Sequence, residues 1–205
     1  ALVGLLSPFG PLYLAAWGIG TRVSLMGRMP GFVLGMGTRT LVGQNLGACR
    51  PDRARRGVWV ALGAMTVSVS AVTAFLLLWA EAVVRFFGMG GEATAVGALC
   101  VRILAAGLFF DASRRLIAGA FEGASAMKPP MIVEAVIRWG VLIPGAYMAA
   151  VPLGFAAPGV WCVFAGSQVV GFILIFIWYL MGIREGGAPL FRGMAAGGGG
   201  PPTGI

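Results

Sequence analysis

The sequence of 205 residues contains no histidine, and its seven acidic residues are outnumbered by fifteen lysines and arginines. The absence of histidine excludes zinc and haem sites that are built on histidine ligands. Charged residues make up only 11% of the chain, whereas hydrophobic residues make up 59% and the mean hydropathy is +0.90. This composition argues against a water-soluble fold and predicts an integral membrane protein.

The sequence also lacks the motifs of catalytic and cofactor sites. It shows no nucleophile–base constellation, no glycine loop after a strand that would cradle a phosphate, and no cluster of metal ligands. Its three cysteines, Cys49, Cys100 and Cys162, follow no pairing pattern and are expected to be small packing residues. We therefore expect neither an enzyme nor a bound cofactor.

The basic residues give the chain a formal net charge of +8, but they stand at the ends of apolar segments and do not form a soluble basic face. This placement argues against a nucleic acid partner. By the positive-inside bias it marks cytoplasmic turns of a multi-pass membrane protein with lipid around it. We expect the membrane to be a bacterial-type inner membrane. The arginines that mark these turns are Arg50, Arg53, Arg55 and Arg56 on one side and Arg184 and Arg192 on the other.

The apolar runs predict an all-α, polytopic helix bundle. A helix needs about 20 residues to cross a hydrocarbon core of about 30 Å. A first helix is predicted from Pro11 toward Leu46, with Gly47 as its terminator and a kink at Pro30. Four further spans follow, an even number that agrees with cytoplasmic basic turns at both ends. These spans are predicted over residues 57–80, 92–123, 129–151 and 159–183.

Asp111 is an acid inside an apolar run, where a charge is tolerated if it faces water, a cation or a partner within the bundle. Such a carboxylate can alternate between proton-bound and ion-bound states, so Asp111 is predicted to couple transport to an ion or to line a cavity, with Na⁺ as the one metal ion that could bind there. The competing interpretation is a salt bridge, since Arg115 follows at the favourable acid-first spacing. Arg114 and Glu122 extend the polar stripe on this helix, and Glu122 is expected to be solvated or paired near the cytoplasmic end.

Three arginines, Arg22, Arg28 and Arg39, interrupt the first helix. Arg28 and Arg39 are eleven residues apart and lie on nearly the same helix face. They are predicted to snorkel or to pair with a carboxylate of a neighbouring helix, and direct contact with a ligand is the alternative.

Two further pairs are expected to be structural. Glu134 and Arg138 repeat the acid-then-base spacing and predict a local ion pair that nothing else polar adjoins. Gly119 and Gly123 form a small-xxx-small pair, which predicts close packing between helices.

Several motifs, in a fixed order over roughly residues 10 to 183, resemble the multidrug and toxic compound extrusion (MATE) family. The similar segments are Ala15–Val23, Met29–Gly31, Thr40–Ala48 with Gln44 inside it, Asp111–Gly123 with Lys128–Met131, and Ile143–Tyr147. The resemblance implies one lobe of a two-lobe secondary transporter that exports organic cations in exchange for Na⁺ or H⁺.

By the same resemblance the chain corresponds to the C-terminal lobe, over residues 1–183. The lobe would hold five complete transmembrane helices and a stub of its first helix at residues 1–6, with the N-terminal lobe missing. Residues 184–205 are predicted to form a flexible Gly/Pro-rich cytoplasmic tail.

The resemblance also implies which residues form the site. Asp111, Arg114 and Arg115 are expected in the ion-coupling and substrate cavity, and Gly107 stands where the family can carry a tyrosine that assists the aspartate. Residues of secondary importance are Arg22, Arg28, Gln44, Glu134 and Arg138. Two other functions stay open: a lipid-linked oligosaccharide flippase of related architecture, which would use these arginines to bind pyrophosphate, and a non-transporting membrane scaffold subunit.

Overall fold

The computed structural model describes residues 10–150 and 156–184, and every regular element in these ranges is helical. The stub predicted at residues 1–6 and the tail beyond residue 184 lie outside the described residues. The helices are α2 (Pro11–Gly27), α3 (Met29–Gly47), α4 (Pro51–Leu78), α5 (Ala80–Phe86), α6 (Glu92–Gly123), α7 (Lys128–Ala135), the π-helical η2 (Val136–Leu142), α8 (Ile143–Ala150) and α9 (Ala156–Arg184).

Within residues 10–150 and 156–184, four of the helical segments are long and apolar enough to cross a membrane, which confirms the predicted multi-pass bundle. The segments are Pro51–Leu78, Glu92–Gly123, Lys128–Ala149 and Ala157–Gly182. Each corresponds to one of the four spans predicted after the first helix. The first helix is present as α2 and α3, which together begin at Pro11 and end at Gly47 as expected.

The break between α2 and α3 lies at Arg28, two residues before Pro30. Proline has no N–H to donate and its ring clashes with the carbonyl one turn earlier, so a helix kinks or breaks just before it. Arg28 thus lies at a joint, where its backbone N–H donates to the carbonyl of Ser24 and its own carbonyl accepts from the N–H of Phe32. The predicted kink is confirmed.

The span predicted over residues 129–151 is not a regular α-helix, and this feature was not foreseen. Its middle part, η2, is a π-helix, and the N–H of Ile143 donates to the carbonyl of Arg138 five residues before it. Pro144 follows immediately and cannot continue the α-helical hydrogen bonding. The wider turn places Arg138 and Trp139 in a segment of a kind often found at functional sites.

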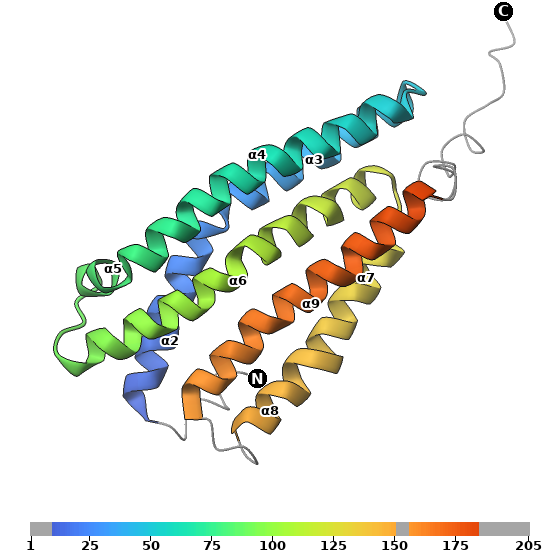
Figure 1. Cartoon of the computed structure of the whole chain (residues 1–205). Helices are drawn as coiled ribbons and strands as arrows, with labels where there is room; N and C mark the ends of the chain where they lie inside the picture. Colours follow the sequence, from blue (N-terminus) through green and yellow to red (C-terminus); the bar gives the residue numbers. More distant parts are fainter. Residues whose placement is uncertain (1–9, 151–155, 185–205) are drawn as a thin grey trace, which may run out of the picture.

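Helix α6 is the centre of the bundle and packs against α2, α3, α4, α5 and α9 (Figure 1). The chain turns from α3 to α4 and from α6 to α7 at the same end of the bundle at which α9 ends. The arginine-rich turn at residues 50–56, Lys128 and Arg184 therefore lie at one end, as the predicted cytoplasmic side requires.

Glycines allow α3 and α6 to approach each other very closely. A Cβ on Gly119 would clash with the carbonyl oxygen of Gly35, and a Cβ on Gly123 would clash with that of Arg39. Ala112 likewise leaves no room for a side chain at Gly31. The packing role predicted for Gly119 and Gly123 is therefore confirmed.

Replacement of Gly119 by alanine is expected to push α3 away from α6. Overpacking of this kind costs about 1 to 3 kcal/mol, so the thermal unfolding midpoint in detergent should fall by several degrees. Gly63→Ala on α4 is the matched control, because nothing lies within 4 Å of a Cβ built there. Its midpoint should stay or rise slightly, since alanine favours the helix. Equal midpoints for the two variants would contradict the close contact.

Candidate functional site

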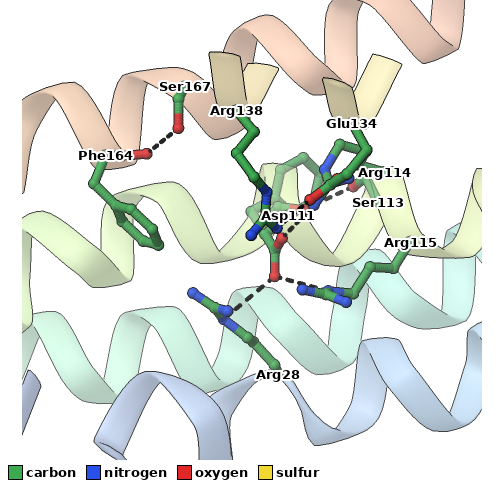
Figure 2. Close-up of polar contacts among 10 residues, drawn as sticks. Arg28, Asp111, Ser113, Arg114, Arg115, Glu134, Arg138, Phe164 and Ser167 are labelled. Atoms are coloured by element: carbon green, nitrogen blue, oxygen red, sulfur yellow. Dashed lines mark hydrogen bonds and ion pairs between the residues drawn. The ribbon is translucent and has the colours of Figure 1, made fainter. Parts of the chain in front are cut away.

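Asp111 on α6 is buried, with 1% of its side chain exposed, and three arginines hold it (Figure 2). Arg114 donates from Nη2 to Oδ1 over 3.1 Å, and Arg115 donates from Nε to Oδ2 over 3.1 Å. Arg28 reaches the same carboxylate from the α2–α3 joint, with Nε 3.3 Å from Oδ2. The predicted salt bridge to Arg115 is present, and it is one of three.

A second carboxylate, Glu134 on α7, continues this chain of charges. Arg138 donates from Nη2 to Oε1 over 2.7 Å, and Arg114 donates from Nη1 to Oε2. The prediction of a pair with no other polar neighbour was wrong, because Arg114 bridges from Asp111 on α6 to Glu134 on α7. The residues joined in this way, called here the Asp111 network, are Arg28, Asp111, Arg114, Arg115, Glu134 and Arg138.

Arg39 and Glu122 form a further pair, with Nη1 3.3 Å from Oε2. Arg39 follows Arg28 by eleven residues on α3, and Glu122 follows Asp111 by eleven residues on α6. The helices α3 and α6 run in the same direction. Because the two spacings are equal, the Arg28–Asp111 and Arg39–Glu122 pairs both form along the contact between these helices. The prediction that Arg28 and Arg39 pair with carboxylates of a neighbouring helix is confirmed.

Three of the residues singled out in the sequence lie apart from this network. Arg22 and Gln44 are exposed, and in the described part of the chain neither makes a side-chain hydrogen bond or ion pair. At Gly107, a Cβ would lie 3.1 Å from the Cα of Ala165 on α9. A tyrosine would not fit there, so Gly107 serves the packing of α6 on α9.

An open cavity of about 730 Å³ lies between α3, α6 and the α7–η2 segment. Arg114, Arg115, Glu134 and Arg138 line it from the Asp111 network, and Arg39 and Glu122 also face it. Its apolar wall was missed by sequence reasoning, although Phe32/Met36 and Met127/Met131 stand at the four-residue spacing of a shared helix face. The wall consists mainly of Phe32, Met36, Met127, Met131 and Trp139.

The charges at the cavity do not cancel. The Asp111 network and the Arg39–Glu122 pair together contain five arginines and three carboxylates. Their summed formal charge is therefore +2. Both oxygens of Asp111 and both oxygens of Glu134 already accept from guanidinium groups. Each oxygen of Asp111 and Glu134 thus has a guanidinium partner, whereas Glu122 is paired at Oε2 alone, and the arginines still have N–H groups to offer.

A comparison with known families identifies the kind of protein. A family model described as MatE matches residues 1–148 of this chain. The chain belongs to the MatE family of transporters. Its relatives are transporters and not enzymes, which confirms the resemblance seen in the motifs and the non-enzymatic assignment.

Curated relatives support this membership. The chain is 30% identical over 171 residues to the "Probable multidrug resistance protein NorM" of Mesorhizobium japonicum, which covers 80% of this chain and 37% of the relative. It is 29% identical over 188 residues to the protein of the same name from Bradyrhizobium diazoefficiens, which covers 89% and 40%. The chain therefore spans well under half the length of these relatives.

Solved structures agree with the fold. The chain is similar to a crystal structure of MATE in the bent conformation, with a TM-score of 0.80 and 25% identity over 86% of this chain and 39% of that one. This MatE-family chain thus has the helix arrangement of part of a larger transporter.

Arg114 is the link of the network, and its replacement by glutamine is expected to destabilise the bundle. Asp111 and Glu134 would each lose a partner, and removal of one member of a buried ion pair costs about 3 to 5 kcal/mol. The thermal unfolding midpoint should fall by at least several degrees. Arg85→Gln is the control, because Arg85 pairs with Glu81 at 4.0 Å on the exposed surface of α5. An unfolding midpoint unchanged by Arg114→Gln would show that the Asp111 network does not stabilise the helix bundle.

Proposed function

We propose that this chain is one lobe of a secondary active exporter of small amphipathic compounds in a bacterial inner membrane. It would work by rocking against an N-terminal lobe, as expected for transporters built from two repeated halves. The observation that supports the proposal is the open cavity of about 730 Å³. Charged side chains of the Asp111 network line one part of it, and the apolar wall lines another. Its volume lies within the roughly 300 to 1,000 Å³ typical of small-molecule sites. The names of the curated relatives support drug export.

We propose that ion coupling acts through exchange of partners at Asp111. An ionised Asp111 holds Arg28 and Arg115, whereas a neutralised carboxylate no longer attracts them. Because Arg28 lies at the α2–α3 joint, its release removes the ionic contact between that joint and α6, and the packing of Gly31 on Ala112 remains. Ion binding would therefore favour a different arrangement of the lobe from the one with the network assembled, as coupled transport requires.

The proton is the coupling ion that this arrangement favours. Na⁺ is a hard cation, and such ions are held by several oxygen ligands. In the described residues, guanidinium groups occupy both oxygens of Asp111, and no group of three or more acidic, cysteine or histidine residues could hold a metal ion. A proton needs only one oxygen of the carboxylate.

Asp111→Asn is expected to uncouple transport. The amide has the shape of the acid but neither takes up a proton nor holds the arginines by charge, so efflux driven by a pH gradient should fall at least about tenfold. The measurement is dye efflux by the natural gene product in vesicles with an imposed pH gradient. Glu81→Gln is the control, because Glu81 is an exposed acid on α5 outside the network. A normal gradient-driven rate in Asp111→Asn would remove Asp111 from the coupling step.

The arginines also favour one alternative, a flippase for lipid-linked oligosaccharides. The net charge of +2 at the cavity would suit a pyrophosphate group. Translocation of a lipid-linked precursor and efflux of soluble dyes, measured in the same vesicles, separate the two functions. Dye efflux without precursor translocation would support the exporter, and the reverse result would support the flippase.

A further inference from the structure

We propose that an anionic phospholipid binds this chain through its phosphate headgroup, at the end of the bundle where α4 begins and α9 ends. The binding surface, called here the α4–α9 patch, consists of Arg55, Arg56 and Trp59 on α4 and Phe176 and Tyr179 on α9. This site lies apart from the cavity, and its existence does not depend on the proposed function.

The arginines at the start of α4 have no acidic partners. Arg50, Arg53, Arg55 and Arg56 are all exposed, and within residues 10–150 and 156–184 none of them forms an ion pair or a side-chain hydrogen bond. Asp52 is the one acid of this turn, and it is exposed and unpaired in the same ranges. By contrast, every arginine of α6 pairs with a carboxylate. A cluster of free basic residues beside a membrane span is typical of sites for anionic lipid headgroups.

Helix geometry directs two of these arginines toward the aromatic part of the patch. Arg55 and Arg56 precede Trp59 by four and three residues, so the three side chains share one face of α4. Arg53 lies about 120° from Trp59 around the helix axis and belongs to another face. Asp52 lies on the face of Trp59, two turns before it, where its charge opposes the binding of an anion. A phosphate can accept two parallel hydrogen bonds from one guanidinium group.

Trp59 connects α4 to α9. The centroid of its ring lies 6.4 Å from that of Phe176 and 6.4 Å from that of Tyr179. Trp59 is 44% exposed, and Trp178, the neighbour of Tyr179 in the sequence, is exposed as well. Tryptophan and tyrosine are enriched where membrane spans meet the headgroup layer. The patch thus has the composition expected at the depth of phosphate headgroups.

The hydroxyl of Tyr179 is a second, independent observation. Tyr179 is 0% exposed, and in the described part of the chain its hydroxyl has no hydrogen-bond partner. An unpaired buried hydroxyl costs free energy, and the large majority of such groups do have a partner. Arg55 lies near this hydroxyl. As Arg55 turns toward a bound phosphate, the hydroxyl is uncovered and donates to a headgroup oxygen.

The chain offers no acidic segment of its own for this surface. Beyond residue 184 the sequence contains one acid, Glu185, and one arginine, Arg192. Among the described residues, none on α4 or α9 lines the cavity, so a ligand in the cavity does not reach the patch. A lipid of the surrounding membrane has the required negative charge and is present at the depth of the patch. An anionic phospholipid is therefore the occupant that fits both the arginines and the exposed aromatic surface.

The test compares two phospholipids that share their acyl chains. Dioleoyl phosphatidylglycerol, an anion, and dioleoyl phosphatidylcholine, which has no net charge, are titrated into the natural gene product in detergent, and bound lipid is measured by native mass spectrometry. We expect phosphatidylglycerol to bind at least about tenfold more tightly. Equal binding of the two lipids would overturn the proposal. Glycerol 3-phosphate at the same concentrations should not displace the lipid, and displacement would show a site for free phosphate instead.

Variants of one turn separate the patch from the overall charge of this end of the bundle. Arg55→Gln should weaken phosphatidylglycerol binding about fivefold, the effect of one basic residue at a membrane surface. Arg53→Gln is the matched control, because it removes the same charge from another face and should weaken binding less than about twofold. Equal weakening by both variants would contradict a defined site. Asp52→Asn should strengthen binding about threefold, a gain that misfolding cannot produce, and weaker binding would count against the patch.

Tyr179→Phe tests the hydroxyl by itself. Binding of phosphatidylglycerol should weaken at least about threefold, because one hydrogen bond to a charged group is lost. Without added lipid, the thermal unfolding midpoint in detergent should stay or rise, since the hydroxyl has no partner among the described residues. A lower midpoint with unchanged lipid binding would show that Tyr179 serves only the packing of the bundle, and would remove it from the site.

Discussion

The attraction between one buried carboxylate and three guanidinium groups organises the site. Asp111 lies at the centre of the bundle, and its partners come from the α2–α3 joint and from two successive positions of α6. A single unpaired charge at such a place would be costly, whereas a fully paired one fixes the positions of its partners. Arg114 then carries this order to Glu134 on α7, so that three segments of the chain share one set of charges.

The network depends on a second constraint, the close contact between α3 and α6. Gly35, Gly119 and Gly123 let the two backbones approach until no side chain would fit between them. Since both helices run in the same direction, the eleven-residue spacing of Arg28 and Arg39 matches that of Asp111 and Glu122. Packing of small residues therefore sets the register in which the ion pairs form.

Periodicity and composition were enough to predict most of the fold. The apolar runs gave the membrane spans because their length must match the hydrocarbon core, and the bounds of α6 were predicted correctly at Glu92 and Gly123. The kink near Pro30 followed from the chemistry of proline. The π-helical turn at residues 136–142 did not follow, because its hydrogen bonding differs from an α-helix by one residue and leaves no periodic signal.

The sequence by itself determined that this is a multi-pass helical protein with a buried acid, since hydrophobic length and charge placement act locally along the chain. It also determined the local pairs Asp111/Arg115 and Glu134/Arg138, because helix geometry fixes residues four positions apart. Only the tertiary structure decided that Arg114 joins both acids and that Arg28 reaches Asp111 from another helix. These contacts depend on how separate helices pack, and that packing sets the net positive charge of the cavity.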